Sequence, residues 1–204
     1  MNFLWNNIHD MTKYIAILFL VIITCSGYSQ ETPFSEDELK NFQQKAQDKA
    51  SKFSEYLSII ASKSIPLEDR EDAIRLACGL FISDTVRIQV SYCPKKGEPE
   101  IISRTLIDYL RRLCWLPYDE VKIEWVEFSV LGKLHRGIDG KYYGLIGYVQ
   151  RFQGIKGDMI YEDTTFKTIE VVLVTYSKYD ESGEEKIVWD VFLSNIKIEE
   201  PCID

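Results

Sequence analysis

The chain has 204 residues and a formal net charge of −8, from 32 acidic and 24 basic side chains. Nucleic acids and anionic membrane surfaces are bound through clustered Lys and Arg, and this acidic sequence has no basic cluster, which argues against both classes of partner. The length and the hydrophobic content of 46% suit one domain with a single core.

The N-terminal segment has the features of a signal peptide. Its uncharged apolar run Tyr14–Thr24 follows Lys13. That run is too short for a membrane-spanning helix, which needs about 20 apolar residues, but it has the length of a signal-peptide core. Gly27 and Ser29 supply the small residues expected before a cleavage site. We therefore predict cleavage after Ser29 and a mature chain without a transmembrane domain.

Two further interpretations of this segment stay open. Residues 1–10 contain an acid but no Lys or Arg, which is unusual in a signal peptide and points to Met11 as the true start. Cys25 resembles the lipidated cysteine of bacterial lipoproteins, although Thr24 is a poor match to the small residue expected before it. We expect an exported protein in the periplasm or cell envelope of a Gram-negative bacterium, with a lipid anchor at Cys25 as the alternative to simple cleavage.

The first half of the mature chain is predicted to be mainly helical. Ser35 and Glu38 form a capping-box pattern, and apolar residues then recur every three or four positions as far as Ile60. Pro66 starts a second helix, because its fixed φ and missing N–H are tolerated in a first turn. An alternating strand is expected at Thr85–Tyr92, and a third helix at about Ile101–Cys114.

The second half predicts an antiparallel meander. Its strands are expected at Val121–Leu131, Lys141–Gln153, Tyr161–Tyr176 and Lys186–Ile198. The apolar phase changes after Trp125, as a β-bulge would produce, and Gly144 and Gly147 indicate sharp bending of the second strand. Apolar residues occur on both faces of this sheet. One face should pack on the helices, and the other on more protein, a ligand or a partner.

This order of elements resembles the nuclear transport factor 2-like superfamily, a cystatin-like α+β roll with N-terminal helices packed on a strongly bent antiparallel sheet. The resemblance covers about Phe34–Ile198. Three short segments resemble the sequences of a group of uncharacterised exported bacterial proteins, namely Ala77–Phe81, Asp139–Gly144 and Trp189–Leu193. The resemblance implies a pocket inside the cone between the sheet and the helices, and homodimerisation through the sheet face as a natural variant. We divide the chain into signal peptide, linker, one domain and tail, at 1–29, 30–33, 34–199 and 200–204.

Catalytic candidates are few. His135 is the only histidine after the signal peptide and lies beside a hairpin loop, so histidine-based catalysis and histidine-rich metal sites lose support. The sequence has no phosphate-binding loop, dinucleotide fingerprint or Cys-x-x-Cys motif, so neither a cofactor nor a metal is expected. The resemblance to the nuclear transport factor 2-like superfamily implies that an enzyme of this kind would place an Asp, His or Tyr in the cone pocket. Asp84 and Glu127 are weak catalytic candidates, and each would need burial to raise its pKa toward neutrality.

Four residues are candidates for lining a ligand pocket, namely Trp125, Tyr148, Gln150 and Tyr161. Aromatic side chains with polar tips line small-molecule sites, but they also form ordinary cores. The direction of Tyr148 matters most, because a ring inside the cone beside Gln150 would favour a ligand site. The favoured function is an exported, non-enzymatic protein that binds an apolar small molecule or a protein partner. The alternative is a small isomerase or hydrolase that uses a buried carboxylate in the cone pocket.

Four cysteines follow the signal peptide. Cys78 and Cys114 occupy apolar positions of predicted helices, where a free cysteine behaves as a small buried hydrophobe. Cys93 and Cys202 each lie just beyond a predicted strand and could be oxidised in an exported protein. Free thiols throughout are the expectation, and Cys93–Cys202 is the favoured pair if one disulfide forms.

Overall fold

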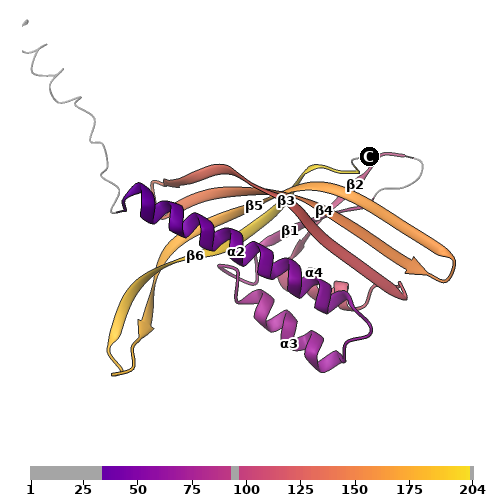
Figure 1. The fold of residues 1–204 in the computed structure, drawn as a ribbon, viewed down its shortest axis with the longest axis horizontal. Helices are drawn as coiled ribbons and strands as arrows, with labels where there is room; N and C mark the ends of the chain where they lie inside the picture. The colour runs from indigo at the N-terminus through magenta and orange to yellow at the C-terminus, as the bar shows by residue number, and fades with distance from the viewer. Residues whose placement is uncertain (1–33, 93–96, 203–204) are drawn as a thin grey trace, which may run out of the picture. The chain divides into compact units, whose positions relative to one another are not determined.

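The computed structural model describes residues 34–92 and 97–202, so the expectations for the signal peptide, for Cys25 and for Cys93 lie outside the described residues. Within these ranges, three helices and six strands form one α+β unit that starts at Phe34 (Figure 1), which confirms the α+β class of the prediction. In chain order the elements are α2 (Glu36–Ala61), α3 (Leu67–Cys78), β1 (Arg87–Tyr92), β2 (Glu100–Thr105), α4 (Leu106–Cys114), β3 (Glu120–Arg136), β4 (Tyr142–Lys156), β5 (Met159–Tyr179) and β6 (Glu185–Glu200).

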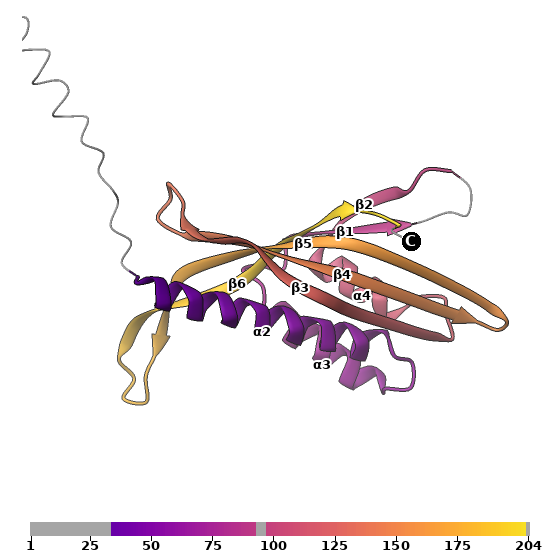
Figure 2. The same cartoon turned by 45° about the horizontal axis from the view of Figure 1, so that its top comes forward.

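The strands form one open sheet in the order β2-β1-β6-β5-β4-β3, and the helices lie on one side of it (Figure 2). The expectation of an antiparallel sheet is wrong at one junction, because β1 runs parallel to β6 through the pair Ile88 and Ile196. Strands joined by tight turns pair antiparallel, whereas a parallel pair needs a long connection. The chain between β1 and β6 supplies that connection, so the sheet is mixed.

The segment Glu100–Thr105 also differs from the prediction. It was expected to begin the third helix, but it forms β2, which pairs antiparallel with β1 along its whole length. Its two isoleucines are β-branched and suit a strand. Thr105 then accepts a hydrogen bond from the backbone N–H of Asp108 at 3.3 Å, so it caps α4, which begins only at Leu106.

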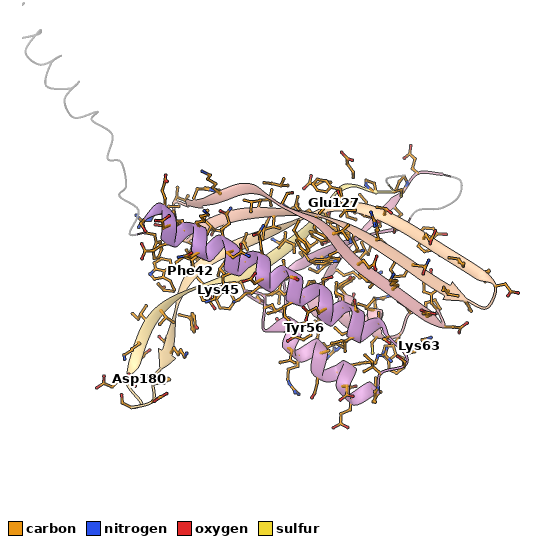
Figure 3. All side chains as sticks on the ribbon, viewed as in Figure 1. Phe42, Lys45, Tyr56, Lys63, Glu127 and Asp180 are labelled. Atoms are coloured by element: carbon orange, nitrogen blue, oxygen red, sulfur yellow. The ribbon has the colours of Figure 1, made fainter. Side chains whose placement is uncertain are left out.

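Helix α2 forms as predicted. The side chain of Ser35 accepts from the backbone N–H of Glu38, and the Glu38 carboxylate accepts from the backbone N–H of Ser35 at 2.8 Å. The apolar stripe of this helix is fully buried in the core, through Ala46, Ala50, Phe53, Leu57 and Ile60. On the side facing β6, Lys45 (Figure 3) and Lys49 both reach the carboxylate of Asp190, at 2.5 and 3.1 Å.

Arg70 of α3 joins the ends of the two other helices. Its buried guanidinium donates to the carbonyl oxygen of Ile60 at 2.9 Å and to the carbonyl oxygen of Cys114. The last carbonyls of a helix have no donor within their own helix. One buried side chain therefore satisfies the C-terminal ends of both α2 and α4.

The predicted bulge in the first long strand is confirmed. The β3–β4 register shifts between Val126 and Ser129, and Glu127 between them has a φ of 58°. Glu127 is exposed on this strand (Figure 3). The bulge therefore turns the carboxylate of Glu127 to solvent.

The cysteines differ in oxidation state. Cys202 is disulfide-bonded, so the expectation of free thiols throughout is wrong at this position. It follows a strand rather than lying in a helix, where burial would shield a thiol. Cys78 and Cys114 are free, as expected from their positions at helix ends packed into apolar surroundings.

Candidate functional site

A cavity of about 640 Å³ is lined by residues of α4, the loop that follows it and strands β1 to β5. Its deep end is formed by Gln150 and Lys167, which are 9% and 2% exposed. Its mouth is formed by exposed side chains, among them Tyr92 and Trp115. The cavity therefore runs from a solvent-accessible rim to polar groups inside the unit.

Lys167 is the chemically unusual residue of this cavity. Its ammonium group lies 3.3 Å from the side-chain oxygen of Gln150 and 3.4 Å from the carbonyl oxygen of Gln89. Among the described residues, no carboxylate lies within ion-pair distance of it. Burial lowers the pKa of Lys167 to about 8, although the negative charge of Asp163 opposes this effect. At neutral pH the cavity therefore holds a buried positive charge without a close counter-charge.

Buried aromatic side chains contact Gln150 at the deep end of the cavity. Trp125 donates through its indole N–H to the Gln150 side-chain oxygen at 3.2 Å, and its ring stacks on Tyr148 with centroids 3.9 Å apart. Tyr148 is fully buried, and its hydroxyl has no hydrogen-bond partner in the described part of the chain. Burial raises the pKa of the Tyr148 phenol, as it does for Tyr109, which lines the cavity. Both phenols therefore stay neutral near physiological pH.

Four aromatic rings form the wall nearer the mouth. Tyr118 and Phe152 pack edge to face at 5.7 Å, and Phe152 contacts Tyr161 at 5.9 Å. Tyr161 is also stacked with Tyr92 at 6.3 Å. The Tyr118 ring lies over Gly154, where an added Cβ would come within 2.7 Å of it. Glycine at this position therefore makes room for one wall of the cavity.

The lining is basic although the chain is acidic. Four basic side chains line it against two acidic ones, in a chain of net charge −8. Asp108 is paired with Arg104 and Arg112 at 3.3 Å each. Asp163 accepts a hydrogen bond from Thr165 at 2.7 Å. The local excess of positive charge favours negatively charged ligands.

The residues predicted for a ligand pocket fall into two groups. Gln150 and Tyr161 line the cavity, whereas Trp125 and Tyr148 are buried in the core beside it. The sequence reasoning missed Lys167. A signal for it was present, because Lys167 alternates in phase with Ile169, Val171 and Leu173, which are buried on the same side of β5.

The two catalytic candidates do not meet in this site. Asp84 and Glu127 are both exposed, and neither lines the large cavity. Asp84 borders a second hollow of about 430 Å³ near α3, and Glu127 lies in the bulge of β3. An enzyme that depends on a buried, desolvated carboxylate therefore gains no support from these two residues.

No group of three or more His, Cys, Asp or Glu within residues 34–92 and 97–202 is arranged to hold a metal ion. No helix in the same ranges is long and apolar enough to cross a membrane. No family model, curated protein or solved structure matches this chain. The candidate site is therefore described from the residues that line the cavity, without residue roles taken from a related protein.

Proposed function

We propose that this chain is an exported cell-envelope protein that binds a small molecule in the large cavity, without acting as an enzyme. The observation that carries the proposal is the pairing of that cavity with Lys167, a buried charge at its deep end. A volume of about 640 Å³ falls within the range of small-molecule sites. Aromatic walls with a few placed polar groups are the usual composition of such sites.

The sequence pattern and the chemistry of one cysteine support export. The signal-peptide pattern before Gln30 supports secretion. The disulfide at Cys202 supports an oxidising compartment, because disulfides are rare in the cytosol of most organisms. The periplasm or outer envelope combines both conditions, with lipidation at Cys25 as the route to an anchored form.

The nuclear transport factor 2-like roll remains the proposed fold family. Two helices, β1, a third helix and a four-stranded meander follow one another in the order on which the resemblance rests, and β2 is an addition to that order. A cavity between α4 and the helix-facing side of the sheet supports the same assignment. The open face of the sheet is the surface through which a homodimer would form.

A cavity-filling variant tests the binding function. Val90 lines the cavity, so Val90→Trp should fill it and abolish binding of a fluorescent apolar probe such as pyrenebutanamide. Val130→Trp is the matched control, because Val130 is 38% exposed and lies outside the lining. Circular dichroism checks that both variants fold. If both folded variants bind the probe with equal affinity, the proposal is contradicted.

A further inference from the structure

The positive charge of Lys167 at the deep end of the cavity favours a negatively charged ligand. Lys167 donates to two uncharged oxygens, Gln89 O and Gln150 Oε1, at 3.4 and 3.3 Å. Both distances exceed the roughly 2.9 Å of a typical N–H···O bond. Asp163 acts on Lys167 through its negative charge at a distance, and its carboxylate accepts a hydrogen bond from Thr165. A buried ammonium in these surroundings is stabilised by an anion that enters the cavity.

The rim of the cavity also attracts anions. Arg104 and Arg112 share one carboxylate, that of Asp108. Arg111 lines the same rim and forms no ion pair among the described residues. A rim with surplus positive charge raises the local concentration of an anionic ligand and directs it inward.

The aromatic rings that line the cavity favour a ligand with a flat, apolar ring system. Tyr92, Tyr118, Phe152 and Tyr161 present rings with neighbouring centroids 5.7 to 6.4 Å apart. Offset and edge-to-face contacts with such rings favour planar, aromatic ligands. The rings line the same cavity as Lys167, so a ligand with a negatively charged end and a flat body would match both features.

We propose that the cavity binds a planar, largely apolar carboxylate, with its carboxylate against Lys167 and its ring system among the aromatic walls. This inference rests on the proposed binding function and adds the chemical class of the ligand. An ammonium has three N–H donors. Two of them point at Gln89 and Gln150, which leaves one for a carboxylate oxygen. A phosphate ester has three strong acceptor oxygens, whereas Lys167 has one N–H donor left, which suits a carboxylate better.

A matched pair of probes tests this inference on the full mature chain. Pyrenebutyrate and pyrenebutanamide share one ring system and differ in the charge of the terminal group. Fluorescence titration at about pH 7 should show the carboxylate bound at least about tenfold more tightly than the amide, as expected for a charge-assisted hydrogen bond. Lys167→Met should remove most of this preference while amide binding persists. Lys178→Met, which removes an exposed charge from the same strand, should keep it.

The outcomes separate the two proposals. If both probes bind with equal affinity to the unmodified chain, the carboxylate inference is overturned and the binding function stands. If neither probe binds, both proposals fail. A carboxylate preference that survives in Lys167→Met but disappears in Arg111→Met would assign the anion to the rim and would also overturn the inference.

A pH series on the unmodified chain tests the same charge without a substitution. Because the pKa of Lys167 is lowered to about 8, the carboxylate preference should decline above that pH as the amine loses its proton. The other titratable side chains around the cavity are carboxylates, guanidiniums and phenols, whose ordinary pKa values lie outside pH 7–9. They are Arg104, Asp108, Arg111, Arg112 and Asp163, with the tyrosines Tyr92, Tyr109, Tyr118, Tyr148 and Tyr161. A preference that stays constant from about pH 7 to 9 would contradict the inference.

Discussion

The ammonium of Lys167 lies 3.3 Å from the side-chain oxygen of Gln150. That oxygen also accepts the indole N–H of Trp125 at 3.2 Å, so one amide links the aromatic core to the buried charge. The link holds Gln150 in place but does not neutralise Lys167. Without a ligand, the charge of Lys167 is therefore a cost to the folded state.

The buried charge of Lys167 should lower the free energy of unfolding in a pH-dependent way. The pKa of Lys167 is about 8 in the folded chain, below the ordinary lysine value of 10.5 that applies in the unfolded chain. Between these values the unfolded chain binds more protons, so the destabilising effect is complete below about pH 8 and fades as the pH rises toward 10.5. Lys167→Met should be more stable than the unmodified chain by about 1–3 kcal/mol at pH 7.

Urea denaturation measures this difference at two pH values. The stability gap between Lys167→Met and the unmodified chain should narrow by about 2 kcal/mol from pH 7 to 9.5. Both proteins carry the same tyrosines, so the gap isolates Lys167. Lys178→Met serves as control and should show no comparable change. An unchanged gap would mean that Lys167 is not a buried charge.

Arg70 should be the main tie between the helix ends. Arg70→Ala leaves the buried carbonyls of Ile60 and Cys114 without their donor, and we expect a loss of about 3–4 kcal/mol of unfolding free energy. Arg75→Ala in the same helix is the control, because Arg75 makes an exposed pair with Asp72, which typically contributes less than about 1 kcal/mol. Comparable losses for the two variants in urea denaturation would contradict the assignment.

Gly154 should control the aromatic wall. Gly154→Ala forces the Tyr118 ring away, because a Cβ would lie 2.7 Å from it. We expect a loss of about 1–3 kcal/mol of stability, together with weaker binding of pyrenebutanamide. Gly132→Ala is the control, since its nearest contact would be Leu145 at an ordinary 3.6 Å. Fluorescence titration compares the two, and unchanged affinity in Gly154→Ala would exclude Tyr118 from the binding surface.

Asp190 should anchor α2 to β6. Burial alone would raise the pKa of Asp190, but hydrogen bonds from Lys45 and Lys49 outweigh burial and lower it. Its contribution is therefore present at neutral pH and lost as the pH falls below about 3.8, the ordinary range of Asp. Asp190→Asn should cost about 1 kcal/mol at neutral pH.

The acid dependence checks this anchor. The cost of Asp190→Asn in urea denaturation should begin to shrink as the pH falls below about 3.8 and should continue to shrink as the pH passes through the lowered pKa of Asp190. Asp72→Asn, which breaks an exposed pair within one helix, provides the comparison and should have a smaller effect at neutral pH. A cost for Asp190→Asn that does not depend on pH would rule out the ionic anchor.

Mass spectrometry of the protein from its native host tests the export route. Cleavage after Ser29 predicts a mature N-terminus at Gln30. Lipidation predicts instead a diacylglyceryl mass on Cys25 as the first residue, lost in a Cys25→Ser variant. An intact segment before Cys25 would contradict both forms of processing.

Local signals made much of this fold predictable from sequence. The capping box of Ser35 and Glu38, the apolar stripe to Ile60 and the phase change at Glu127 all act within a few residues of each other. The long strands were visible through alternation. These features depend on backbone geometry that neighbouring residues determine.

The misses depend on contacts between distant segments. β2 was mistaken for helix because Glu100–Thr105 becomes a strand only by pairing with β1, and the parallel pairing of β1 with β6 has no local signal. In the site, Gln150 and Tyr161 were visible as polar members of aromatic strands. Lys167 was missed although it alternates in phase with buried residues of β5, because the cavity that it lines is formed by segments far apart in the chain.

The bulge at Glu127 has a further consequence for the outermost strand. β3 is an edge of the open sheet, and an uninterrupted edge is a template for pairing with strands of other molecules. Glu127 interrupts that edge with an exposed charge and a left-handed backbone, a conformation that costs about 1 kcal/mol or more for such a residue. The strained glutamate thus protects the longest unpaired edge against aggregation.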